Sequence, residues 1–96
     1  MDQKENMMDL EIRKRRVLYQ ANHRGTYEAD LMIGRFASEY VPAMDEQELD
    51  VLEHIMSFDD ADLTLWLTGF KEIPTSLNSP MIQKMCDFAK TIHSKA

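Results

Sequence analysis

Charged side chains gather around one glycine in the first third of this chain. Arg24 and Gly25 are followed by two carboxylates, Glu28 and Asp30, four and six residues after the arginine. A guanidinium beside carboxylates suits a polar contact with a partner, and a glycine lets another backbone approach closely. A second interpretation stays open, in which Arg24 and Glu28 form a surface ion pair worth about 0.3 kcal/mol and Gly25 only ends a helix.

Other side chains that could act in catalysis or bind a metal are scattered along the sequence. His23, His54 and His93 stand about thirty or more residues apart, and the chain has neither an HExxH pair nor a cysteine cluster. Cys86 lies between Met85 and Phe88, which predicts a buried apolar role. A GxSxG elbow, a Walker A loop and a GxGxxG fingerprint are all missing. We therefore predict no catalytic residue and no metal site.

Three aspartates at positions 59, 60 and 62 could suggest a calcium loop. An EF-hand loop requires a central glycine and a closing glutamate, and this segment has neither at the required spacing. Carboxylates are favoured at the N-terminus of a helix by the helix dipole. We interpret the aspartates as the start of a helix.

The composition predicts one small soluble domain. The chain has 96 residues, of which 44% are hydrophobic and 29% charged, enough for one modest core. No apolar run approaches the ~20 residues needed to cross a bilayer, and Asp2, Glu5 and Asp9 make the N-terminus unlike a signal or transit peptide. A single cysteine suits a reducing compartment. These features predict a bacterial cytoplasmic protein with no direct membrane insertion.

The net charge of the chain is -6, and the charged residues are unevenly distributed along it. Residues 36–72 hold one basic and ten acidic side chains, whereas residues 1–35 hold seven basic and six acidic ones. Nucleic-acid binding draws much of its affinity from cationic side chains, so the acidic middle predicts no nucleic-acid partner. The exception is the run Arg13, Lys14, Arg15 and Arg16, which is either a solvated helix face or part of a docking patch together with His23 and Arg35.

The hydrophobic period is helical and predicts an all-α fold, a compact five-helix bundle over residues 1–96. Residues 1–8 are expected to be flexible, and a first helix should span about 9–22. A second helix is expected over about 26–39, and Pro42 prevents it from continuing much further. The inward stripes of these helices are Leu10, Val17, Leu18 and Ala21 in the first, and Ala29, Met32, Ile33, Phe36 and Tyr40 in the second.

Capping signals place the remaining helices. Asp45 and Glu48 resemble a capping box that opens a third helix ending near Ser57. A fourth helix follows the aspartates and should stop at Gly69. Ser79 and Pro80 predict a C-terminal helix over 79–94. The expected inward residues are Leu49, Leu52, Ile55 and Met56, then Leu63, Trp66, Leu67 and Phe70, and finally Ile82, Met85, Phe88, Ala89 and Ile92.

The string Arg24-Gly25-x-x-Glu28-x-Asp30 resembles the RGxxE signature of the small FAD assembly factors of succinate dehydrogenase. A second string, Asp59-Asp60-x-Asp62-Leu63-x-x-Trp66-Leu67, is similar to the same family in order and spacing. The likeness covers residues 10–74, which we take as the family core. Thr26 departs from the pattern, because methionine is frequent at that position.

The resemblance implies a protein that binds the flavoprotein subunit of succinate dehydrogenase, and in bacteria also that of fumarate reductase, and promotes covalent attachment of FAD to a histidine of the subunit. Arg24, Gly25 and Glu28 would form the partner-binding motif, with Asp30 beside it. We hypothesise a non-catalytic, monomeric chaperone that binds no FAD tightly itself and holds its client in reactive geometry. FAD would be the cofactor of the client.

Two rivals remain. The first is a regulatory, antitoxin-like or DNA-associated helical module, in which the helix carrying Arg13 to Arg16 meets phosphate. The second is a small enzyme that handles free FAD, and a flavin titration of the isolated protein would distinguish it from an assembly factor.

Overall fold

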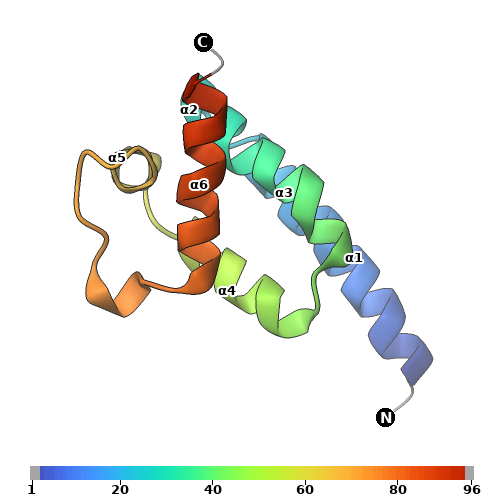
Figure 1. The fold of residues 1–96 in the computed structure, drawn as a ribbon. Coiled ribbons are helices and arrows are strands. Elements are labelled where there is room, and N and C mark those ends of the chain that lie inside the picture. Colours follow the sequence, from blue (N-terminus) through green and yellow to red (C-terminus); the bar gives the residue numbers. More distant parts are fainter. Residues whose placement is uncertain (1–2, 95–96) are drawn as a thin grey trace.

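The computed structural model describes the backbone of residues 3–94 and the side chains of residues 9–92. Every regular element in this part of the chain is helical, which confirms the predicted all-α fold. Figure 1 shows α1 and α3 running alongside each other, with α6 beside them, α5 across α6 from them and α4 at the lower end of α6. These helices surround a single hydrophobic core.

The first helix, α1 (Gln3–Asn22), begins six residues earlier than the sequence predicted. Its backbone is helical over 3–8, where we expected a flexible segment, and residues 1 and 2 lie outside the described part. The end at Asn22 agrees with the prediction. Val17 and Ala21 are fully buried, and Leu10 and Leu18 pack against the core as expected.

The predicted second helix is divided by a π-helical turn. It comprises α2 (Tyr27–Ala29), η1 (Asp30–Gly34) and α3 (Arg35–Tyr40). Thr26 begins it, because its Oγ1 accepts a hydrogen bond from the backbone N–H of Ala29 at 3.3 Å. The inward stripe is buried from Ala29 to Phe36, and Tyr40 packs at its edge.

Gly34 sits where the second helical segment crosses α1. A Cβ at this position would lie 2.5 Å from Asn22 Oδ1 and 3.1 Å from the Ala21 carbonyl oxygen. A side chain at position 34 would therefore require the Asn22 side chain to move and would press against the backbone of α1. The π turn that ends at Gly34 therefore packs directly against the end of α1.

The short 3-10 helix η2 (Val41–Ala43) leads into α4 (Glu46–Met56). The capping box is confirmed: Asp45 Oδ1 accepts from the Glu48 N–H at 2.9 Å, and Glu48 Oε1 accepts from the Asp45 N–H at 3.0 Å. The four inward residues of α4 are buried as predicted: Leu49, Leu52, Ile55 and Met56.

The next helix, α5 (Asp60–Leu67), follows Asp59 at its N-cap and ends before Gly69, whose φ of +82° lies in the left-handed region. Leu63, Trp66 and Leu67 are buried, but the expectation for Phe70 is wrong, since it is 84% exposed. The chain reverses at Gly69, so the helical spacing no longer applies one residue later. Gly69 itself was predicted correctly as the stop.

The last elements are the 3-10 helix η3 (Thr75–Leu77) and α6 (Pro80–Ser94). Ser79 Oγ accepts from the Ile82 N–H at 3.3 Å and caps α6 as predicted. Ile82, Met85 and Ala89 are buried, and Phe88 packs edge-on against the Phe36 ring. Helix α6 contacts η1, α4 and α5 and so closes the core.

Cys86 differs from its predicted burial. It is half-buried at the side of α6 facing α5, with Sγ 3.8 Å from the carbonyl oxygen of Trp66. Removal of solvent around the thiol raises its pKa above the ordinary value of 9.0. The raised pKa disfavours the thiolate, which is the nucleophilic form of cysteine.

Candidate functional site

The motif occupies the corner between α1 and α2. Gly25 has a φ of +106°, a left-handed conformation that disfavours any residue with a Cβ. A Cβ added there would meet no atom within 4 Å, so the requirement for glycine comes from the backbone rather than from crowding. The conformation turns the chain sharply out of α1.

The Arg24 guanidinium is directed into the molecule and is only 12% exposed. Its Nε donates to Asp60 Oδ1 at 2.5 Å, while Nη1 and Nη2 donate to the carbonyl oxygens of Met56 and Phe58, each at 2.8 Å. Those carbonyls lie at and just after the C-terminal end of α4, where helices leave acceptors unsatisfied. Arg24 thus ties the α1–α2 corner to the α4–α5 corner.

The Arg24 side chain follows neither of the two local interpretations of the motif. Arg24 pairs with Asp60, thirty-six residues away, and the Arg24–Glu28 surface pair is not formed. The expectation that the Arg24 side chain extends toward a partner does not fit its position, because its donors are engaged within the chain. Its contribution is to hold the motif in place.

The two carboxylates of the motif differ in their exposure to solvent. Asp30 is half-buried, and its Oδ1 accepts from the backbone N–H of Arg24 at 2.9 Å. Glu28 is exposed on the first turn of α2 and makes no hydrogen bond or ion pair with the described residues. Arg24 and Asp30 therefore fix the corner, and Gly25 and Glu28 are displayed on it.

The basic run is also divided by its surroundings. Arg13 forms ion pairs with both Asp50 and Glu53 of α4. Its hydrogen bond to Asp50 raises the Arg13 pKa most, and the hydrogen bond to Glu53 raises it further. Lys14 Nζ donates to the Pro42 carbonyl oxygen at 2.8 Å. Arg15 and Arg16 are exposed and have no polar partner among the described side chains. Arg13 is thus the member of the run that is paired with carboxylates, whereas Arg15 and Arg16 are exposed without a polar contact to the described residues.

The remaining candidates of the docking patch, His23 and Arg35, are both exposed. The His23 ring stacks on Tyr19 with centroids 4.0 Å apart, and its Nδ1 lies 2.8 Å from the Tyr19 carbonyl oxygen. Arg35 makes no ion pair within the part of the chain that the structure describes. Both side chains are accessible to a partner.

Two shallow pockets flank Arg24. One, of about 460 Å³, includes Tyr19, His23 and Ser57. The other, of about 520 Å³, is lined by Thr26, Tyr27, Glu28, Asp60, Ala61, Thr64 and Leu65. Sequence patterns did not predict this second pocket, because Tyr27 and Leu65 lie off the inward helical stripes and thirty-eight positions apart. The sequence signal that could have found them is that Tyr27 and Leu65 are large apolar residues at positions outside the inward stripes, where a soluble helix usually carries polar residues.

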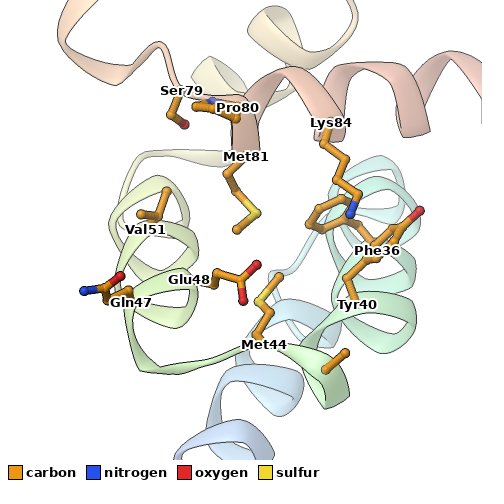
Figure 2. A pocket seen from close by; sticks show the side chains of 11 residues that line it. Phe36, Tyr40, Met44, Gln47, Glu48, Val51, Ser79, Pro80, Met81 and Lys84 are labelled. Atoms are coloured by element: carbon orange, nitrogen blue, oxygen red, sulfur yellow. The ribbon is translucent and has the colours of Figure 1, made fainter.

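A further groove of about 530 Å³ lies between α3, α4 and α6, away from the motif. Figure 2 shows its lining, in which Met44 and Met81 approach each other from opposite sides and Lys84 extends toward the Tyr40 ring. The Lys84 Nζ stands 3.9 Å from the centroid of that ring. None of the motif residues lines this groove.

Metal-ligating side chains do not cluster within residues 9–92: no three His, Cys, Asp or Glu side chains there are placed to hold an ion together. Among the described helices, none has the length and apolar character needed to span a bilayer.

The fold and the site together define a class: a small all-helical protein that presents a glycine and an acidic residue on a corner fixed by a half-buried arginine. A family described as the flavinator of succinate dehydrogenase matches residues 15–89. This chain belongs to that family, a family of assembly factors, and the resemblance inferred from the motif is confirmed. The match runs past residue 74 and includes most of α6.

Named relatives agree with the family. The FAD assembly factor SdhE of Acetobacter pasteurianus is 38% identical over 79 residues, which are 82% of this chain and 72% of that protein. Succinate dehydrogenase assembly factor 2-A, mitochondrial, of Drosophila willistoni is 31% identical over 83 residues, 84% of this chain and 53% of the relative. A Saccharomyces cerevisiae relative, succinate dehydrogenase assembly factor 2, mitochondrial, is 31% identical over 85 residues and is covered over 52% of its length. The chain thus spans about half the length of these mitochondrial relatives.

Proposed function

We propose that this protein binds the flavoprotein subunit of succinate dehydrogenase and promotes the covalent attachment of FAD to that subunit. The observation that carries the proposal is the displayed pair Gly25 and Glu28, held at the motif corner by Arg24 and Asp30. Family membership supplies the client class, and the geometry supplies a surface that could contact it.

The mechanism we propose is positional. Glu28 contacts a polar group of the client near the flavin, and the glycine at position 25 allows the client backbone to approach. Restricting the client histidine and the flavin to a reactive arrangement lowers the barrier without any group of the assembly factor reacting. Bond formation is left to the client and its FAD, and no residue of this chain is assigned to hold the cofactor tightly.

Substitution of Glu28 by alanine tests this function. In a defined mixture of client apoprotein, FAD and this protein, we expect Glu28→Ala to slow flavinylation about tenfold or more, since a charged hydrogen bond contributes roughly 1.5–3 kcal/mol. In-gel flavin fluorescence after denaturation measures the covalent product. Glu72→Ala is the matched control, because Glu72 is an exposed carboxylate after α5 with no polar partner among the described side chains.

The outcomes separate the two parts of the proposal. If the unchanged protein does not accelerate flavinylation, the function is wrong. If it does, but Glu28→Ala is as fast as Glu72→Ala, the assignment of the motif is wrong.

We also propose fumarate reductase as a second client, action as a monomer and residence in a bacterial cytoplasm. The Arg24 contacts that fix the motif are complete within one chain, which supports a single copy as the active unit. The same flavinylation assay with the fumarate reductase flavoprotein tests the client range. Sedimentation of the isolated protein tests its oligomeric state, and a flavin titration tests whether it binds free FAD.

A further inference from the structure

Two large apolar side chains are exposed next to the motif. Tyr27, on α2, is 78% exposed, and Leu65, on α5, is 40% exposed. Helices α2 and α5 contact each other, and both residues line the same pocket of about 520 Å³. The pocket also includes Glu28, so it is continuous with the displayed part of the motif.

The core does not require these two residues. Ala29 of α2 and Leu63, Trp66 and Leu67 of α5 are buried in the core, whereas Tyr27 and Leu65 are exposed. We therefore expect a polar residue at position 27 or 65 to leave the core packing unchanged. Single exposed apolar residues are common on protein surfaces. Here two of them line one pocket beside a charged motif, which favours a contact surface.

The charge of the pocket indicates what would enter it. Its charged lining residues are Glu28 and Asp60. Asp60 is paired with Arg24, so Glu28 is the carboxylate left without a counter-ion from the described residues. An apolar group next to a cation would complement both the apolar lining and this charge.

We infer that the Tyr27–Leu65 pocket receives an apolar side chain of the client flavoprotein, next to a client lysine or arginine that pairs with Glu28. This inference rests on the proposed function. Tyr27 stands between Gly25 and Glu28 in the sequence, so an apolar contact here extends the same docking surface onto α5. It assigns to α5 a binding role in addition to its place in the core.

The chain offers a matched control for each substitution. Phe70 is an aromatic residue at 84% exposure, beyond the end of α5, and corresponds to Tyr27. Val51 is an aliphatic residue at 37% exposure on α4, where it lines the groove of Figure 2, and corresponds to Leu65. The controls remove similar exposed apolar surface away from the motif.

Calorimetric titration of the client apo-flavoprotein with each variant tests the inference. We expect Tyr27→Ser and Leu65→Ser to raise the Kd about tenfold each, equivalent to about 1.4 kcal/mol, because each removes an apolar side chain that the client would bury at the centre of the contact. Tyr27→Phe should restore most of the affinity. Phe70→Ser and Val51→Ser should stay within about twofold of the unchanged protein, and circular dichroism should show all variants folded.

Each result has a defined meaning. If the unchanged protein binds the client and the Tyr27 and Leu65 variants bind equally well, the pocket is not part of the interface, and the proposed function stands. If Val51→Ser weakens binding as much as Leu65→Ser, the loss of affinity is not specific to the Tyr27–Leu65 pocket, and the inference is overturned. If the unchanged protein does not bind the client, the proposed function fails and the inference fails with it.

Discussion

Arg24 stabilises the junction of α4 and α5 through the geometry of its guanidinium group. Three nitrogens point at three oxygens, two of them backbone carbonyls. A planar fork makes such contacts together, whereas a lysine ammonium on a flexible chain cannot span all three. Loss of function on changing Arg24 would therefore come from the displaced corner and not from a missing contact with the client.

A stability measurement distinguishes these roles. We expect Arg24→Ala to lower the free energy of unfolding by about 2–4 kcal/mol, because Asp60 and two carbonyls lose their partner. Arg24→Lys should keep the charge but lose about 1–2 kcal/mol. Urea denaturation followed by circular dichroism measures both values.

Arg35→Lys is the control, since Arg35 is exposed and makes no ion pair with the described residues, and its change should stay within about 0.5 kcal/mol. An Arg24→Lys protein as stable as the unchanged one would contradict the role we give to the fork.

The helical segment after the motif is positioned by its crossing with α1. The π turn from Asp30 to Gly34 places the buried glycine against the last turn of α1, and α2 and α3 extend from it on either side. Turns of π-helix often occur beside functional sites, since an extra residue shifts the faces before and after it. Here the turn begins at Asp30, the residue that holds the Arg24 backbone.

The crossing predicts a coupled pair of substitutions. Gly34→Ala should destabilise the protein by about 1–3 kcal/mol, because the new methyl would meet Asn22 Oδ1 at 2.5 Å. In an Asn22→Ala background that clash is gone, leaving the Ala21 carbonyl oxygen at 3.1 Å. The higher helix propensity of alanine, worth roughly 1 kcal/mol, then offsets most of the remaining cost.

A double-mutant cycle by urea denaturation measures the coupling between positions 22 and 34. Additive effects of the two substitutions would show that the Asn22 side chain moves aside without cost. In that case the backbone of α1 alone would limit the crossing.

At the scale of the whole molecule, the basic and acidic segments partly neutralise each other. Arg13 of α1 is engaged by Asp50 and Glu53 of α4, and Asp60 of α5 is engaged by Arg24. Arg15 and Arg16 are left exposed on α1, the helix that ends at the motif corner. We propose that they attract an acidic surface of the client before contact is made.

This arrangement predicts an effect on association kinetics. Arg16→Glu should slow association with the client about threefold at low ionic strength, with little change in the dissociation rate, and the difference should shrink at high salt. Stopped-flow or surface-based kinetics over a salt series measures both rates. Lys71→Glu is an equal charge change at an exposed position after α5, and an equal slowing there would show a net-charge effect instead of local steering.

Several features of this protein are determined by residues close together in the sequence. The capping box at Asp45, the Ser79 cap and the stops at Gly25 and Gly69 depend on contacts within about four residues, so the pattern predicts them correctly. The family could also be identified from two short strings. The helical spacing of apolar residues likewise predicted most of the buried positions, because it depends on residues three or four positions apart.

Only the tertiary structure decided what the motif arginine does and what surrounds it. The partners of the Arg24 side chain lie thirty-two to thirty-six residues away, and those of the Arg13 side chain lie thirty-seven to forty away. Phe70 departs from the helical stripe because the chain reverses at Gly69, and Tyr27 meets Leu65 only because α2 packs on α5. Such contacts depend on how the helices pack against one another, whereas the periodicity of a sequence reports only which face of each helix is buried.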